Sequence, residues 1–334
     1  MADLKASYMG IELKNPVVAG ACDLTANLDT IKKIEDAGAG ALVLKSLFEE
    51  QIQLEQARFD EEMQQFDDLH AEMTDIFPEI EHSGPDEHLL FVQKAKEACD
   101  IPVIASLNAV NNATWTEWAK KLEQTGADGL ELNFFANPDL QAAEGASIEK
   151  DQIGVVKEIA SSLKIPVAVK MSVFYTAPLA VAEAFVEAGA KGLVMFNQLF
   201  QPDIDPEKES SVVRINLSEK SASKLPLRYS GLLYGETDAS VIASSGIMDG
   251  KDVAKMILAG ADAVQVVSTL YRHKVSQIGV MVDELGAWMD AKGYGSLDDF
   301  RGKMSRKNST DPWTYKRAQY VQLLMKSNPM AANR

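Results

Sequence analysis

The chain has 334 residues, 46% of them hydrophobic and 25% charged, and 49 acidic against 33 basic residues give a formal charge of −16. This composition is typical of a soluble globular protein and excludes the collagen-like, disordered and disulfide-scaffold classes. Because phosphates repel a strongly negative protein, we expect it to bind neither nucleic acid nor an anionic membrane surface.

Metal chemistry and membrane insertion find little support in the sequence. The only cysteines, Cys22 and Cys99, form no CxxC or Cys/His pattern, and the four histidines form no HxH or HExxH motif. We therefore expect no metal site. The amino terminus lacks a signal-peptide pattern, and no apolar stretch of about 18 residues follows, so we expect a cytoplasmic protein.

Eight short runs rich in Val, Ile, Leu and Ala recur along the chain and are typical of buried parallel strands. They span residues 16–21, 41–47, 102–108, 129–135, 166–172, 192–198, 241–247 and 263–269. Segments with apolar residues at helical spacing lie between them, for example 28–37 and 115–125. The chain therefore alternates between strands and helices.

The ends of four of these helices share one pattern, in which a glycine is followed directly by a strand. The phrases are AGAGAL, TGADGL, AGAKGL and AGADAV, which begin at residues 37, 125, 188 and 259. Glycine is the residue that most easily adopts the left-handed cap of a helix. Eight such units, without a GxGxxG fingerprint, predict one (β/α)8 TIM barrel spanning residues 1–334 as a single domain.

Two insertions and a tail interrupt the regular spacing. The insertions, 48–85 after the second strand and 199–240 after the sixth, both leave carboxyl strand ends and should lie over the active-site face. The first carries twelve acidic residues against one basic residue. We interpret it as a lid with an acidic outer face, or as an acidic docking surface for a basic partner. The basic tail, 301–334, predicts a helix at 313–326 packed on the barrel or on a second subunit.

Polar residues at the carboxyl ends of barrel strands converge on one mouth. Here these ends supply lysines, asparagines and small residues: Lys45, Ser46, Asn108, Asn133, Lys170, Asn197, Ser245, Gly246, Ser268 and Thr269. Glu131 has no carboxylate partner among them, which argues against a retaining glycosidase.

This set of side chains matches the needs of a flavin nucleotide. Asparagine amides both donate to and accept from a flat heterocycle, and lysines stabilise the negative charge of a reduced flavin. The backbone at Ser245–Gly246, at the opening of the following helix and at Ser268–Thr269 predicts a phosphate cradle. We therefore predict FMN as the cofactor. Cys22, at the end of the first strand, is a candidate proton donor, with a buried inert thiol as the alternative.

The residues at these positions resemble the FMN-dependent dihydroorotate dehydrogenases, particularly the soluble class 1 enzymes, and the pyrimidine-reducing domain of dihydropyrimidine dehydrogenase. The resemblance covers residues 8–280 and rests on GIELKNPVVAGA, VLKS, ELN, VK, FN and SSGIMDGKDVAKMILAGADAVQV.

The resemblance implies a role for each matching position. Lys45 and Ser46 would contact flavin and substrate, Asn133 and Asn197 would hydrogen-bond both rings, and Lys170 would meet the pyrimidine end of the flavin. The remaining residues that would line FMN are Gly20, Ala21, Asn108, Ser245, Gly246, Val267 and Ser268. We take Lys45, Asn133 and Cys22 as the catalytic candidates. The resemblance also implies a homodimer and a separate electron-transfer partner.

The sequence departs from the family where the substrate should bind. The family's NxxCPN or NxxSPN motif, whose Cys or Ser takes the C5 proton of dihydroorotate, is replaced by NFFANPD at 133–139, with Ala136 at the position of the base. The family's NxxGLPN loop is also absent from the insertion 48–85. The residues expected to bind flavin therefore match those of the family, whereas the residues expected to bind substrate differ from them.

Three functions are compatible with these residues. The first is a flavin oxidoreductase that acts on CH–CH groups, converting dihydroorotate to orotate in pyrimidine biosynthesis or acting on a related small cyclic substrate. The second is an FMN-binding partner or redox subunit without dihydroorotate turnover. The third, a phosphate-sugar isomerase or aldolase, would use Lys170 as a Schiff-base residue.

Overall fold

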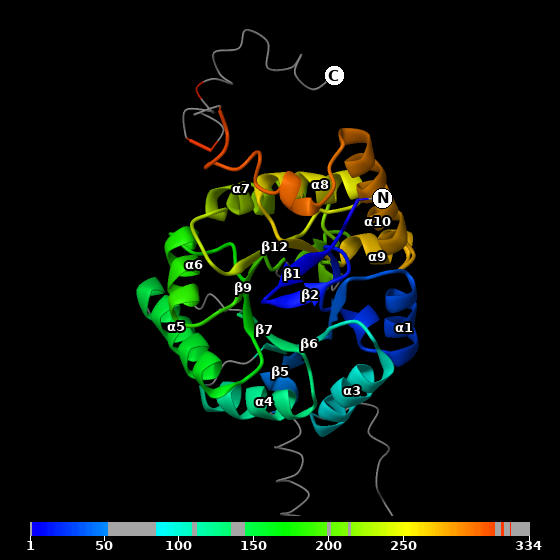
Figure 1. Cartoon of the computed structure of the whole chain (residues 1–334). Helices are drawn as coiled ribbons and strands as arrows, with labels where there is room; N and C mark the ends of the chain where they lie inside the picture. The colour runs from blue at the N-terminus through cyan, green and yellow to red at the C-terminus, as the bar shows by residue number, and fades with distance from the viewer. Residues whose placement is uncertain are drawn as a thin grey trace, which may run out of the picture.

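The computed structural model describes residues 2–52, 85–108, 112–134, 144–198, 202–212, 215–310, 315–316 and 321. Within these ranges, eight parallel strands form a closed barrel surrounded by helices (Figure 1). In sheet order they are β4 (Ala41–Val43), β3 (Val17–Ala19), β13 (Ala263–Val266), β12 (Ser240–Ser244), β9 (Gly192–Met195), β8 (Val167–Met171), β7 (Gly129–Asn133) and β6 (Val103–Asn108). Pairing of β4 with β6 closes the ring, which confirms the predicted (β/α)8 TIM barrel.

The strands are shorter than the apolar runs that predicted them. Strand β12 ends at Ser244 because Ser245 and Gly246 have positive φ angles of 84° and 71°, which no strand accommodates. Strand β13 ends at Val266, and the chain turns at once into the short helix α9 (Ser268–His273). The prediction that these strands extend to residues 247 and 269 is therefore wrong. The two-residue strand β5 (Leu47–Phe48) pairs with the end of β6.

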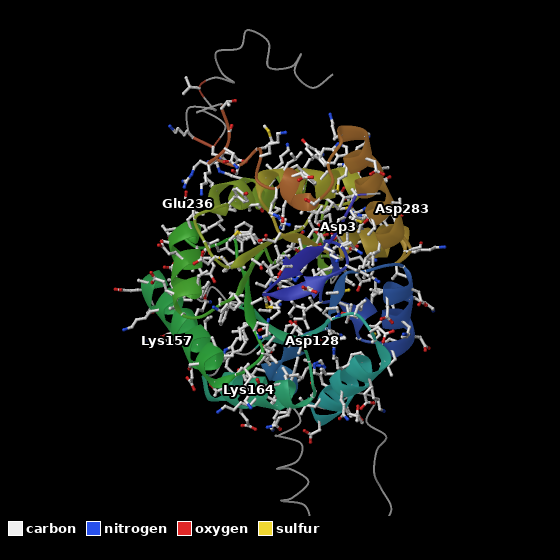
Figure 2. The ribbon with its side chains drawn as sticks, in the orientation of Figure 1. Asp3, Asp128, Lys157, Lys164, Glu236 and Asp283 are labelled. Carbon is white, nitrogen blue, oxygen red and sulfur yellow. The ribbon has the colours of Figure 1, made fainter. Side chains whose placement is uncertain are left out.

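Helices form a ring around the barrel, as Figure 1 shows. They are α1 (Leu28–Asp36), α3 (Pro85–Ala98), α4 (Asn112–Gln124), α5 (Gly145–Ser162), α6 (Pro178–Glu187), α7 (Lys224–Leu233), α8 (Gly250–Ala259) and α10 (Gln277–Lys292). Short 3-10 turns occur at η1 (Asp23–Thr25), η2 (Lys220–Ser223) and η3 (Leu297–Asp299). Exposed charged residues such as Lys157, Glu236 and Asp283 lie on the outer circumference (Figure 2).

The four predicted glycine caps are confirmed by their backbone angles. Gly38, Gly126, Gly189 and Gly260 have φ values of 96°, 85°, 111° and 126°. Each lies between a helix and the barrel strand that follows it. Because side chains with a Cβ rarely adopt these angles, the glycines fix where each helix ends and each strand begins.

A hairpin of β1 (Ala6–Tyr8) and β2 (Ile11–Leu13), here called the plug, closes the amino-terminal end of the barrel. It lies across the middle of the ring in Figure 1. Tyr8, Met9 and Leu13 are buried against inward-facing residues of the strands, including Val18 and Ile104. The Met9 amide donates to Ser240 Oγ at 3.1 Å, which attaches the hairpin to the start of β12. The lower half of the barrel is therefore a packed apolar core.

Parts of both insertions and of the tail are described. Residues 53–84 lie outside the described residues, so the acidic lid expected over 48–85 remains a prediction. Of the helix expected at 313–326, residues 315 and 316 form a turn and a bend instead, and the other residues except 321 lie outside the described residues. The described part of insertion 199–240 contains the hairpin β10 (Asp203–Asp205) and β11 (Ser210–Val212), followed by η2 and α7. Among the residues that the structure describes, we find no helix that combines the length and apolar character needed to cross a bilayer.

The fit of the plug to the barrel predicts a sharp difference between two glycine substitutions. A Cβ on Gly192 would lie 2.7 Å from Tyr8 Cε2 and 2.9 Å from Met9 Cγ. We expect Gly192→Ala to lower the free energy of unfolding by about 1–3 kcal/mol, as overpacking of a core does. Chemical denaturation monitored by circular dichroism measures this change.

Gly154 is the matched control. It is exposed within α5, and its Cβ would meet nothing within 4 Å. Gly154→Ala should raise the free energy of unfolding by about 0.5–1 kcal/mol, since alanine restricts the unfolded chain and suits a helix. Equal effects of the two substitutions would contradict the tight fit of the plug.

Candidate active site

A cavity of about 330 Å³ opens at the carboxyl ends of the barrel strands, opposite the plug. Strand ends, the β3–η1 turn, α9 and residues 215–218 of the second insertion all contribute to its wall. The polar side chains that line it belong to Cys22, Asp23, Lys45, Ser46, Asn133, Lys170, Asn197, Gln198, Asn216, Ser218, Ser244, Ser245, Gln265, Ser268 and Tyr271. The predicted convergence on one mouth is therefore observed.

All but three of the residues proposed from the sequence line this cavity, Ala21, Gly246 and Val267 among them. The exceptions are Gly20, Asn108 and Thr269. A Cβ on Gly20 would lie 2.9 Å from Val267 Cγ2, so this glycine allows β3 to approach the chain that follows β13. Asn108 is buried at the end of β6, opposite Phe48 of β5.

Amides and hydroxyls are paired across neighbouring strands. Asn197 Nδ2 donates to Asn133 Oδ1 at 2.8 Å. The Ser46 and Ser106 hydroxyls are 2.7 Å apart and share a hydrogen bond. The first bond uses neither the Asn133 Nδ2 donor nor the Asn197 Oδ1 acceptor, and both side chains line the cavity.

The two lysines occupy different environments. Lys45 is near the surface, with 43% of its side chain exposed, and its Nζ lies 2.7 Å from Asp23 Oδ1. Lys170 is buried at the end of β8, and its Nζ donates to Gln265 Oε1 at 3.3 Å. Lys170 therefore places a positive charge at the wall where solvent screens it least.

A fully buried carboxylate lies beneath the cavity. Glu131, on β7, points into the barrel interior one layer below Asn133, and its Oε1 is 3.7 Å from Lys170 Nζ. Its Oε2 accepts hydrogen bonds from Tyr8 Oη, at 3.3 Å, and from Gln265 Nε2. Burial, followed by the negative charge of Glu131, raises the pKa of Tyr8 well above its usual value, so this hydroxyl keeps its proton.

The predicted phosphate cradle centres on Gly246 and two serines. Gly246 has φ 71°, and a Cβ there would lie 2.4 Å from the Ser223 amide nitrogen. Its own amide donates to Ser218 Oγ at 3.1 Å, and Ser218 Oγ is 2.8 Å from Ser268 Oγ. Two hydroxyls and a backbone amide thus meet at one point.

One part of the predicted cradle is wrong. At the opening of α8, Asp249 Oδ1 accepts from the Asp252 amide at 2.8 Å, and Glu284 Oε2 accepts from the Gly250 amide at 2.8 Å. These carboxylates occupy the amides that the sequence analysis assigned to a phosphate. The helix opening is therefore capped by side chains of the protein itself, and these two amides already have acceptors.

Ser218 is a site residue that the sequence analysis missed. It is buried, and it belongs to the insertion 199–240 rather than to a strand end. Gln265 and Tyr271 were also missed. The alternation Ala263, Gln265, Val267 along the eighth strand marks Gln265 as inward-facing, which is the signal that would have identified it.

Cys22 lies at the cavity wall and is hydrogen-bonded with the Tyr271 hydroxyl. Burial raises the pKa of the Cys22 thiol, so the thiol retains its proton at neutral pH. Burial, followed by the proximity of Cys22 and Asp23, raises the pKa of Tyr271 to about 12. Both groups therefore reach the cavity in their protonated forms.

Comparison with known proteins shows the family of this chain. The sequence model of the dihydroorotate dehydrogenase family matches residues 77–289. The chain belongs to this family. The chain is 27% identical over 310 residues to the catalytic subunit of dihydroorotate dehydrogenase B (NAD+) from Thermoplasma volcanium. This alignment covers 90% of this chain and 98% of the relative.

Two further relatives are named for different activities. A putative dihydroorotate dehydrogenase A (fumarate) from Aeropyrum pernix is 32% identical over 225 residues, or 65% of this chain and 72% of the relative. The chloroplastic dihydropyrimidine dehydrogenase (NADP+) of Arabidopsis thaliana is 24% identical over 331 residues, or 90% of this chain and 76% of the relative. The predicted family resemblance is confirmed.

The environment of His88 predicts how stability depends on pH. His88 lies on α3, and its buried Nε2 has no hydrogen-bond partner among the described residues. Burial, assisted by the positive charge of Lys45, lowers its pKa from 6.5 to about 4. Between these values the unfolded chain binds the extra proton, so stability is lost as the pH falls from 7.

We expect wild-type protein to lose about 1–2 kcal/mol more than the His88→Phe variant when the pH falls from 7 to 5. Urea denaturation of both proteins at the two pH values measures the difference. Equal losses in both proteins would show that His88 is not held in its neutral form by the fold.

Proposed function

We propose that this protein is an FMN-dependent oxidoreductase that acts on a CH–CH group of dihydroorotate or of a related small cyclic substrate. The observation that carries the proposal is the convergence of Lys170, the Asn133–Asn197 pair and the Gly246–Ser218–Ser268 cradle on one cavity. The names of the relatives support the class of substrate.

The residues of the cavity fit FMN in three respects. The Ser218 and Ser268 hydroxyls lie at the cavity wall and can donate to the oxygens of a phosphate, and Gly246 beside them lets the chain pass close to the Ser223 amide. The paired asparagine amides provide donors and acceptors for the edge of a flat ring. Lys170 provides a positive charge for the N1–O2 side of the ring.

Each residue then has a defined task. Ser218 and Ser268 bind the phosphate, the Gly246 amide orients the Ser218 hydroxyl, and Lys170 with the asparagines orients the ring. The outer lysine, Lys45, contacts substrate and ring from the open side of the cavity. Bound FMN would supply the acceptor for the hydride that leaves the substrate.

Cys22 is the proton-carrying group in this proposal. The base position of the family is occupied by Ala136, which lies outside the described residues and carries no titratable group. The Cys22 thiol lines the cavity and holds its proton at neutral pH. It can therefore donate a proton when a double bond is reduced, and it must first lose that proton to act in the direction of dihydroorotate oxidation.

The family further supports a homodimer, a separate electron-transfer partner and a cytoplasmic location. A redox subunit that holds FMN without turning over dihydroorotate is the second candidate, and the loss of the usual base at Ala136 favours it. The aldolase alternative is weakened by the surroundings of Lys170. An amine held against Glu131 and Gln265 is poorly placed to attack a carbonyl carbon.

Anaerobic addition of dihydroorotate to the FMN-loaded protein tests the proposal. We expect the visible absorbance of the flavin to bleach, with a rate that rises from pH 7 to pH 9 because burial raises the pKa of Cys22. Stopped-flow absorbance measures the rate. A yellow protein that stays oxidised would contradict dihydroorotate turnover and favour the redox subunit.

The Cys22→Ala variant identifies the proton carrier. General acid–base groups contribute about 10²–10⁴ to rate, so we expect bleaching to slow by at least about 100-fold. Cys99→Ala is the matched control, because Cys99 is buried outside the cavity. Equal rates in the two variants would remove Cys22 from the mechanism while leaving the flavin site intact.

A further inference from the structure

A chain of four polar side chains crosses the barrel interior between the plug and the cavity. Tyr8 Oη donates to Glu131 Oε2, and Gln265 Nε2 donates to the same oxygen. Lys170 Nζ in turn donates to Gln265 Oε1. The Gln265 amide therefore bridges a carboxylate and an ammonium group, and both ends of the bridge are buried.

The hydrogen-bond partners of Glu131 define it as an acceptor. Tyr8 is a donor whose raised pKa keeps its proton in place, and the Gln265 contact comes from the amide nitrogen. The second oxygen, Oε1, faces the Lys170 ammonium and has no hydrogen-bond partner among the described residues. Each of these contacts therefore comes from a hydrogen-bond donor or from a positively charged group.

The position of this carboxylate relative to the cavity is the decisive feature. Lys170 and Gln265 line the cavity, whereas Glu131 lies behind them and does not. The distance of 3.7 Å between Glu131 Oε1 and Lys170 Nζ is longer than a hydrogen bond. The ammonium group is thus drawn towards the carboxylate but keeps donors for a ligand on its other side.

We propose that Glu131 is a positioning residue that holds Lys170 beneath the cavity and offsets part of its charge, so that bound FMN is harder to reduce than Lys170 alone would make it. The inference rests on the proposed function, because it requires FMN in the cavity. Glu131 itself neither binds the ligand nor touches the reacting atoms, so its effect acts through Lys170.

The physical reason lies in the charge that reduction adds. Reduced FMN carries negative charge on the N1–O2 side of its ring, which a lysine stabilises and a nearby carboxylate destabilises. Glu131 is fully buried, so water and salt screen its charge only weakly. A flavin above a partly neutralised lysine gives up its electrons more readily to the next acceptor.

The Glu131→Gln variant tests this inference, since glutamine keeps the shape of the side chain and removes its charge. The FMN-loaded protein is equilibrated anaerobically at pH 7 with a dye of known potential. We expect the ratio of affinities for reduced and oxidised FMN to rise at least tenfold, which raises the midpoint potential by about 30 mV or more. Lys170→Met should shift the ratio in the opposite direction.

Asp128→Asn provides the charge-matched control. Asp128 is a carboxylate paired with Lys96 at 2.7 Å on the outside of the barrel, and its removal should leave the potential unchanged. An unchanged or lower potential in Glu131→Gln would overturn the inference. If that variant fails to fold, Glu131→Asp serves instead, because its shorter side chain draws the carboxylate back from Lys170. It should raise the midpoint potential by a smaller amount, and a lower potential would again contradict the inference.

FMN binding and the role of Glu131 can be refuted separately. A wild-type protein that takes up no FMN would refute the proposed function before any variant is compared. A wild-type protein that binds FMN, with a potential that Glu131→Gln leaves unchanged, would refute only the assignment of Glu131.

Discussion

The plug at the amino-terminal end of the barrel is the constraint on which the site depends. Tyr8, Met9 and Leu13 fill the lower interior together with inward-facing apolar residues of the strands. Polar side chains that point inward are therefore confined to the upper layers, where Glu131, Lys170 and Gln265 are found. Because the strands are parallel, and because side chains along each strand alternate between the interior and the helices, these layers face one cavity at the carboxyl ends.

The plug also supplies a polar group to the site it supports. Tyr8 is buried completely, yet its hydroxyl reaches Glu131 from below and helps to hold a charge in a nonpolar interior. A buried ion pair costs desolvation energy, and its retention beneath a cavity is easier to explain by function than by stability. The same interaction thus connects the packing of the barrel end with the electrostatics of the candidate cofactor site.

Much of this arrangement could be predicted from the sequence because it follows from local patterns. Apolar runs located every barrel strand, glycine caps located the ends of four helices, and their position at the carboxyl ends of strands placed Asn133 and Lys170 at the mouth. Ser218 could not be found in this way, since it reaches Gly246 and Ser268 from a long insertion with no periodic signal. The end of β12 depends on backbone angles at Ser245 and Gly246, and the plug depends on packing between distant segments.

The central claim is that the flavin half of the site is intact although the substrate half has diverged. Titration of the flavin-free protein with FMN, followed by quenching of flavin fluorescence, tests it most directly when wild type is compared with Gly246→Ala, whose Cβ would meet the Ser223 amide. The account predicts one FMN per chain in the wild type, with affinity at least tenfold weaker in the variant. Absence of saturable binding in the wild type, or equal affinity in both, would contradict it.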